Sequence, residues 1–172
     1  MSTAIVISPY ESIVMDYLQE VEGYICITDV RFPYKSGKRT VYGDVDILAF
    51  NPKSNKFLIC EVISYTPRTK KDQEVIERKI RVMSGKYLKN FLRSRYGVEE
   101  YEKMLIVWRE TPWLKERLSG SDFKLLTFKD IIQRMINYLK EKQDEVEAWV
   151  RVSSLTLLIL QIVIHFRDEL EI

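Results

Sequence analysis

The chain has 172 residues, of which 46% are apolar and 30% are charged. This composition fits one soluble globular domain over 1–172 and excludes a disordered chain. The net charge is only +2, so contact with nucleic acid would have to come from a local basic surface. No glycine-rich phosphate loop is present, which argues against an ATPase or a dinucleotide enzyme. The tryptophans Trp108, Trp113 and Trp149 are expected in the core or at an interface.

The first half of the chain predicts a helix followed by three strands. Apolar residues at helical spacing predict the helix over 9–22. Alternating residues predict a strand over 24–32, and the turn-rich stretch PYKSGK separates it from a second strand over 39–50. The short connection NPKSN leads into a third strand over 56–64. The second and third strands are therefore predicted to pair as a hairpin.

The second half of the chain alternates helices with strands. We predict a long helix over 71–96, a buried central strand at 104–108, a short helix over 112–118, a strand over 123–128 and an amphipathic helix over 129–142. With the first half, this order predicts an α/β fold in which helices flank a mixed β-sheet, with extra helices towards the C-terminus.

Two features of the chain ends bear on location and assembly. The N-terminal residues lack the basic and apolar regions of a secretory signal, so we expect a cytoplasmic protein. The segment 152–166 has no charged residue but is shorter than the roughly 20 residues of a membrane-spanning helix, so no membrane partner is expected. A helix that is apolar on nearly all sides is buried on nearly all sides. It is predicted to belong to the core or to form a homodimer interface, and the sequence leaves both open.

Acidic residues interrupt the two strands of the predicted hairpin. Residues two apart share one face of a strand, so Asp44 and Asp46 point the same way, as do Glu61 and Ile63. If the hairpin forms, Asp46 and Glu61 lie side by side. Two adjacent carboxylates resist joint ionisation unless a cation neutralises them, and such oxygen ligands suit Mg²⁺. The pattern indicates a divalent-metal site for phosphate chemistry; the alternative is that Asp46 is merely solvated at a strand end.

The same acids carry a resemblance to a known family. The run GDVDILA over 43–49, followed by Glu61 and Val62 on the next strand, resembles the PD-(D/E)XK nuclease superfamily, which has the restriction-endonuclease-like fold. Glu11 in the first helix is similar to a helix glutamate of archaeal and bacterial members. The resemblance covers a core over 9–128 and leaves 129–172 as a C-terminal helical extension.

The resemblance implies a reaction and a role for each matching residue. Asp46 corresponds to the metal-binding aspartate, Glu61 to the glutamate of the ExK motif and Glu11 to the helix glutamate that helps to bind metal. The carbonyl of Val62 corresponds to the position that completes the metal shell. The implied reaction is Mg²⁺- or Mn²⁺-assisted hydrolysis of phosphodiester bonds, with DNA as the expected substrate.

The chain departs from the family at Ile63, where members carry a lysine two residues after the glutamate. One alternative is that the lysine has moved, and Lys79 is the first candidate because its helix is expected to pack near Glu61. A second is that another metal ion or Ser64 partly replaces it. A third is that the protein binds nucleic acid without cutting it. A plain protein-interaction domain is a further possibility.

The segment 66–97 is strongly basic, with ten Lys or Arg residues against three Asp or Glu residues. Such a concentration of positive charge next to the acidic pair predicts a surface that contacts the phosphate backbone. The alternative is a solvated helix whose cations favour its C-terminal end. The residues expected to contact nucleic acid are Arg68, Lys70, Lys71, Arg78, Lys79 and Arg81.

Overall fold

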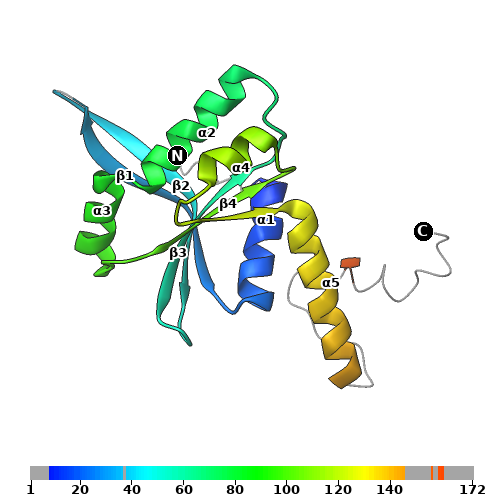
Figure 1. The fold of residues 1–172 in the computed structure, drawn as a ribbon. Helices are drawn as coiled ribbons and strands as arrows, with labels where there is room; N and C mark the ends of the chain where they lie inside the picture. Colours follow the sequence, from blue (N-terminus) through cyan, green and yellow to red (C-terminus); the bar gives the residue numbers. More distant parts are fainter. Residues whose placement is uncertain (1–7, 37, 146–155, 157–158, 161–172) are drawn as a thin grey trace, which may run out of the picture.

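The computed structural model describes residues 8–36, 38–145, 156 and 159–160 (Figure 1). The helices are α1 (Pro9–Asp16), continued by the π-helical segment η1 (Tyr17–Val21), α2 (Lys70–Met83), α3 (Lys86–Tyr96), α4 (Pro112–Leu118) and α5 (Phe128–Glu145). The strands are β1 (Ile25–Ser36), β2 (Arg39–Asn51), β3 (Lys56–Ile63), β4 (Glu102–Val107) and β5 (Phe123–Thr127).

The strands form one mixed sheet in the order β1-β2-β3-β4-β5. β1, β2 and β3 are antiparallel neighbours, whereas β4 runs parallel to β3 and β5 runs parallel to β4. The central strand β3 is almost entirely buried, which explains its nearly continuous apolar sequence. The predicted α/β class, with a mixed sheet flanked by helices, is confirmed, and the arrangement is compatible with a restriction-endonuclease-like core.

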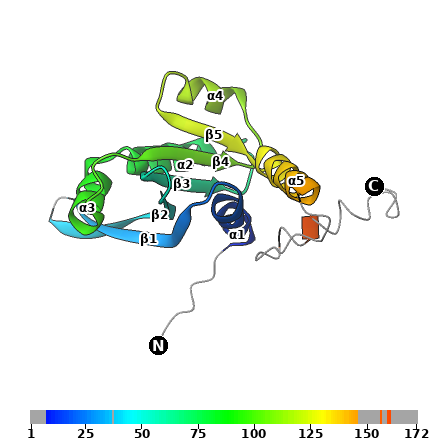
Figure 2. The ribbon, with the colours of Figure 1, turned by 90° about the horizontal axis from the view of Figure 1, so that it is seen from below.

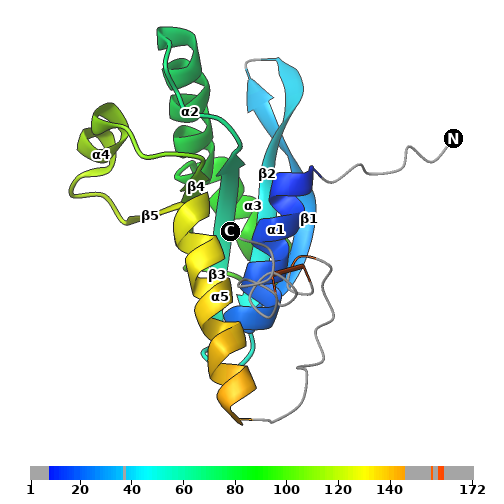
Figure 3. The same cartoon turned by 90° about the vertical axis from the view of Figure 1, so that its right-hand side faces the viewer.

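Two helical layers cover the two faces of the sheet. On one face α1 and α5 lie side by side (Figures 1 and 3), and Val14 and Ile131 pack with Cys60 and Ile106 of the sheet. On the other face α2, α3 and α4 cover the alternate residues of the same strands. Ile63 packs under α2 and α4. Consecutive residues of β3 therefore face different helices, and this alternation decides on which side of the sheet each acidic residue lies.

The prediction of one continuous helix over 71–96 is wrong, because the chain forms two helices there, α2 and α3. Gly85 lies between α2 and α3 in an extended conformation (φ −77°, ψ 144°) and serves as the N-cap of α3. A Cβ atom at this position would lie 3.0 Å from the carbonyl oxygen of Arg81. The close approach of the two backbones explains why a glycine stands at the break, a position that helical periodicity alone does not reveal.

The first strand is longer than predicted and includes most of the stretch expected to be a loop. Its register continues past Pro33, which lies opposite Tyr42. A proline is tolerated there because β1 is an edge strand. On the outer side of an edge strand no neighbouring strand needs the N–H that a proline lacks. The β1–β2 hairpin extends along α3 (Figure 2), which packs Leu88 and Leu92 against Phe32.

The segment 152–166, predicted to lie in the core or in a dimer interface, falls outside the described residues except for Thr156, Ile159 and Leu160. Leu160 packs against the core cluster beneath α1 and α5, whereas Ile159 is 51% exposed. The homodimer remains a prediction. Among the helices that the structure describes, none has the length and apolar character needed to cross a bilayer.

Candidate active site

Strands β2 and β3 stop pairing and separate at Asp46. The β2–β3 ladder runs from the hairpin connection up to the pair Ile47–Cys60, and Asp46 and Glu61 would be the next pair. Here the Asp46 side chain, instead of a backbone carbonyl of β2, accepts a hydrogen bond from β3: the backbone N–H of Val62 donates to Asp46 Oδ2 at 2.7 Å. The bond fixes the orientation of the Asp46 carboxylate in the fork between the two strands.

The third member of the site comes from α2. This helix begins with a capping box formed by Thr69 and Asp72, and its buried residues Ile76 and Ile80 fix it against the sheet. Lys79 therefore lies beside the sheet-facing side of α2 and extends into the fork.

The Lys79 ammonium group lies between the two carboxylates. Lys79 Nζ is 3.2 Å from Asp46 Oδ2 and 3.3 Å from Asp46 Oδ1, and it also donates to Glu61 Oε2. Hence the structure brings together Asp46, Glu61 and Lys79, three residues selected from the sequence for related roles. We refer to these three side chains as the fork cluster.

Burial shapes the electrostatics of the fork cluster. The Glu61 side chain is fully buried, whereas those of Asp46 and Lys79 are 15% and 26% exposed. Burial raises the pKa of Glu61 well above its ordinary value, and the nearby Asp46 carboxylate raises it further. Burial disfavours the charged form of Lys79, but the two carboxylates outweigh this effect and raise its pKa, so the ammonium stays charged.

One oxygen of the fork cluster has no partner among the residues that the structure describes. Glu61 Oε1 is buried and accepts no hydrogen bond within the described part of the chain. A buried acceptor without a donor is costly, and such an atom in a native protein calls for an explanation. A proton on Glu61 or a cation bound to Oε1 would each remove the cost.

The donor set fits Mg²⁺ or Mn²⁺. Within the residues that the structure describes, no three His, Cys, Asp or Glu side chains are close enough to form a metal cluster. Mg²⁺ often takes only one or two carboxylates and keeps several waters, so Asp46 and Glu61, with the Val62 carbonyl that the sequence predicts as a ligand, would be enough to hold it. The unpartnered Glu61 oxygen is the feature that favours such an ion.

Glu11 does not join the fork cluster. It lies in the first turn of α1, where its backbone N–H donates to Ser8 Oγ at 3.2 Å. α1 covers the sheet face opposite to α2, and among the described residues no hydrogen bond or ion pair links the Glu11 carboxylate to Asp46, Glu61 or Lys79. Its role in metal binding remains a prediction.

Packing explains why the usual lysine position holds an isoleucine. Ile63 is 1% exposed and belongs to an apolar cluster with Ile76 and Ile80 of α2 and Leu105 and Val107 of β4. An ammonium group there would be surrounded by hydrocarbon. The positive charge enters the fork from the covering helix instead.

The predicted nucleic-acid-binding residues lie on and just before α2. Lys79 is engaged in the fork cluster, and the others are exposed and form no ion pair within the described residues. Arg78 and Arg81 line a pocket of about 250 Å³ together with Tyr34 and Tyr87. Their contact with nucleic acid remains a prediction. The exposed cations are Arg68, Lys70, Lys71, Arg78 and Arg81.

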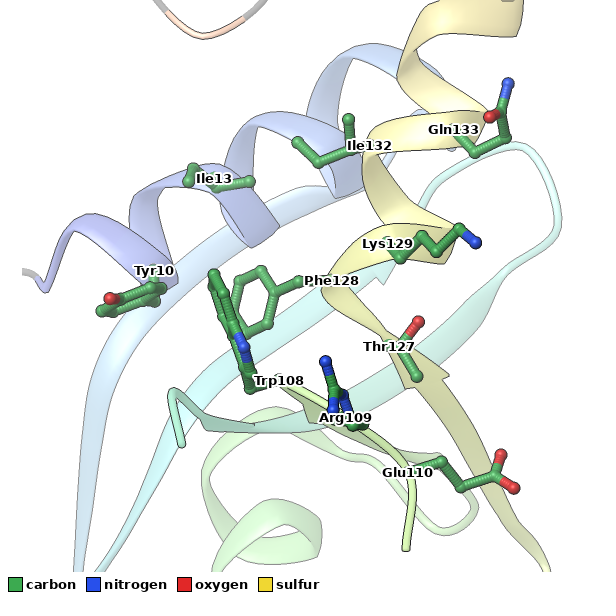
Figure 4. Close-up of a pocket in the computed structure, with 10 residues that line it drawn as sticks. All are labelled: Tyr10, Ile13, Trp108, Arg109, Glu110, Thr127, Phe128, Lys129, Ile132 and Gln133. Carbon is green, nitrogen blue, oxygen red and sulfur yellow. The ribbon is translucent and has the colours of Figure 1, made fainter. Parts of the chain in front are cut away.

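Sequence reasoning missed a second pocket, on the α1/α5 face. It has a volume of about 700 Å³ and is lined by Tyr10, Trp108 and Phe128, among others (Figure 4). Trp108, expected in the core or at an interface, is 50% exposed here. It directly follows β4, and a bulky aromatic residue after an apolar run looks from sequence like the last buried residue of the strand.

No family model matches the chain, and no curated protein matches it. Similar solved structures include protein VC1899 from Vibrio cholerae (15% identity, TM-score 0.46, covering 77% of this chain and 32% of that one). A repair endonuclease from Pyrococcus abyssi matches with 16% identity and a TM-score of 0.36, covering 74% of this chain and 50% of that one. The protein of unknown function AF1548 matches with 10% identity and a TM-score of 0.46, covering 93% and 95%.

The chain thus spans about a third and a half of the first two of these proteins. Similarity at this level assigns no activity to the chain, so its function has to be inferred from its own residues.

Proposed function

We propose that this protein is a metal-dependent nuclease that hydrolyses phosphodiester bonds of DNA at the fork cluster. The observation that carries the proposal is the contact of one ammonium group, Lys79, with two carboxylates, Asp46 and Glu61, where β2 and β3 separate. A pair of carboxylates with an adjacent cation suits metal-assisted phosphodiester hydrolysis, and the buried Glu61 oxygen, which has no partner among the described residues, leaves a position for an ion.

Asp46, Glu61 and the Val62 carbonyl would hold Mg²⁺ or Mn²⁺. Bound there, the ion would lower the pKa of a water molecule and polarise the phosphate. The hydrogen bond from the Val62 N–H keeps the Asp46 carboxylate in one orientation, so little reorganisation is needed when the ion binds. Full burial of Glu61 excludes bulk water from its side of the site and strengthens its interactions with charge.

Lys79 supplies the positive charge that Ile63 cannot. With a metal ion neutralising Asp46 and Glu61, the Lys79 ammonium would be able to donate hydrogen bonds to a phosphate oxygen or to the attacking water. Such a donor stabilises the negative charge that develops on the phosphate, and removing a comparable donor in other enzymes costs about 10²- to 10³-fold in rate.

The exposed cations of α2 would hold the substrate over the cluster. Arg78 and Arg81 lie on the same helix as Lys79 and are exposed. Phosphate contacts by such residues bring affinity without sequence preference and weaken steeply as salt concentration rises. We therefore expect the apparent affinity for DNA to fall with added salt, and less steeply in an Arg78→Ala/Arg81→Ala variant.

The proposal is tested by incubating the protein with supercoiled plasmid, linear duplex, a single strand and a four-way junction in Mg²⁺, Mn²⁺ or EDTA. We expect cleavage only with metal, and its loss in Asp46→Asn and Glu61→Gln. Glu77→Gln is the matched control, because Glu77 is on α2 but its carboxylate pairs with Arg117 outside the cluster. Cutting that persists in EDTA, or in both site variants, would contradict the proposal.

Metal binding is measured separately by calorimetric titration with Mn²⁺ in the absence of DNA. Binding by the native protein that Asp46→Asn and Glu61→Gln abolish would support the ligand set independently of activity.

A second candidate function is nucleic-acid binding without cleavage. The observation in its favour is that Lys79 already neutralises the two carboxylates, as it would in a purely structural ion cluster. Salt-sensitive binding of DNA, with no cutting of any substrate in either metal, would favour this candidate.

A further inference from the structure

The pocket on the α1/α5 face is built around three aromatic rings. Trp108 meets Tyr10 of α1 and Phe128 at the start of α5, and all three rings contact one another (Figure 4). Its ring centroid is 6.0 Å from that of Tyr10, in an edge-to-face arrangement, and 5.8 Å from that of Phe128. Both neighbours hold the indole in place, yet half of the Trp108 side chain is exposed. A large aromatic surface that is both fixed and open suits a planar ligand.

The pocket and the fork cluster lie at the same end of the sheet, on its two opposite faces. The backbone N–H of Trp108 donates to the carbonyl of Ile63 at 3.0 Å, so Trp108 lies where β3 ends. Ile63 is two residues beyond Glu61, which corresponds to about 7 Å along a strand. The Glu61 side chain faces α2, whereas that of Trp108 faces α1. A nucleic-acid strand that wraps around this end of the sheet would therefore contact both.

The rim of the pocket is positively charged. Arg109 and Lys129 are exposed, and within the described residues neither forms an ion pair. Of the described residues that line the pocket, Glu110 is the acidic one, and it is neutralised by Lys115 at 2.8 Å. Asp130, next to Lys129, accepts hydrogen bonds from Thr127. An apolar aromatic floor below two free cations complements a nucleotide, whose base is planar and whose phosphate is anionic. A purely apolar peptide segment would leave these cations without a partner.

We propose that this pocket binds an unpaired nucleobase by stacking it on Trp108, while Arg109 and Lys129 contact the adjoining phosphates. The inference rests on the proposed nuclease function and specifies its substrate: a strand with at least one unpaired base next to the phosphate that is cut. A base inside an intact duplex cannot reach the indole, because both of its faces are stacked on neighbouring base pairs.

The test is a binding measurement in EDTA, where a metal-dependent nuclease does not cut. Fluorescence anisotropy compares a labelled oligothymidylate, an abasic strand of the same length and a duplex. We expect the native protein to bind oligothymidylate about tenfold or more tightly than the abasic strand, since stacking on an aromatic side chain is typically worth this much per base. This comparison needs no variant, so it does not depend on whether a substituted protein folds.

Variants then locate the effect. Trp108→Ala should weaken oligothymidylate binding about tenfold and leave duplex binding unchanged, while Trp108→Phe should retain part of the affinity. Trp113→Phe is the matched control, because Trp113 packs against the apolar cluster under α2 and α4 and does not line the pocket.

Equal affinity of the native protein for the oligothymidylate and the abasic strand would overturn the proposal. So would a Trp108→Ala variant that binds oligothymidylate normally but unfolds at a lower temperature. That result would mean that Trp108 serves the packing with Tyr10 and Phe128 and not the binding of a base. Base-dependent binding without cleavage of any substrate would support the pocket and refute the nuclease, whereas cleavage without base preference would do the reverse.

Discussion

Two groups of charged residues meet α2, and they differ in burial. Glu77 pairs with Arg117 of α4, with side chains 30% and 40% exposed and a second bond of 2.9 Å between Arg117 Nη2 and Glu77 Oε2. Two residues further on, Lys79 enters the fork cluster, where the Glu61 side chain is fully buried. The first pair is typical of a protein surface and contributes about 0–1 kcal/mol to stability.

The second group is harder to explain by stability. Taking charges out of water costs more than their mutual attraction usually returns, and apolar residues of similar size often stabilise a core more. The neighbouring cluster of Ile63, Ile76 and Ile80 shows that this part of the sheet supports apolar packing. The burial of these charges therefore favours a role for the fork cluster in binding or catalysis. Substitutions in the two groups test the difference between them.

The largest loss of stability is expected from Ile63→Lys, which moves a lysine to the position usual in the family. The side chain would have to enter the apolar cluster with Leu105 and Val107. We expect the free energy of unfolding to fall by about 3 kcal/mol or more, because a packed side chain is lost and a charge is buried. Chemical denaturation measures the change. A loss below about 1 kcal/mol would mean that the apolar cluster tolerates a lysine at position 63 of β3.

Lys79→Met is expected to cost about 3 kcal/mol, since it leaves two adjacent carboxylates without their cation. The loss should become smaller in acid, where Glu61 takes up a proton, and in Mn²⁺, which replaces the missing charge. Thermal unfolding at several pH values, with Mn²⁺ or EDTA, checks both effects. A variant that is as stable as the native protein in EDTA at neutral pH would show that the cluster needs no cation.

Glu61→Gln is expected to change how stability depends on pH. Folding raises the pKa of Glu61 above the ordinary value of 4.5, so the folded protein holds this proton more tightly than the unfolded chain does. The stability linked to that proton is complete below pH 4.5 and is lost as the pH rises through the higher folded pKa. Glutamine stays neutral throughout, so the variant should lose less stability over this window. Denaturation curves that shift in parallel for both proteins would contradict the assignment.

The smallest effect is expected from Glu77→Gln, which removes the exposed pair with Arg117. Unfolding should become easier by less than about 1 kcal/mol, and the difference should shrink in high salt. A loss as large as that of Lys79→Met would erase the contrast between the two groups. Thermal unfolding of both variants at low and high salt makes the comparison.

Local patterns in the sequence were sufficient for the part of the site that lies on one hairpin. The register of β2 and β3 follows from a short connection and alternating residues, and it brings Asp46 next to Glu61. Lys79 is a candidate from the sequence because its helix is expected to pack near Glu61, and in the structure it neighbours the buried Ile80.

What the sequence did not reveal depends on contacts between distant segments. The break at Gly85 reflects the approach of two helix ends, which no periodicity records. The exposure of Trp108 depends on how Tyr10 and Phe128 meet it from two different helices. Glu11 matched a family pattern by its position in the chain, but which face α1 covers is decided by packing.

The most direct test of the account is the rate at which Lys79 variants cut DNA. Single-turnover cleavage in Mn²⁺, at a temperature where circular dichroism shows the proteins folded, compares the native protein with Lys79→Met, Lys79→Arg and Glu77→Gln. With DNA binding in EDTA unchanged, we predict a loss of about 10²- to 10³-fold for Lys79→Met, a smaller loss for Lys79→Arg and none for Glu77→Gln. Equal rates for the native protein and folded Lys79→Met would contradict the claim that this lysine replaces the one missing from β3.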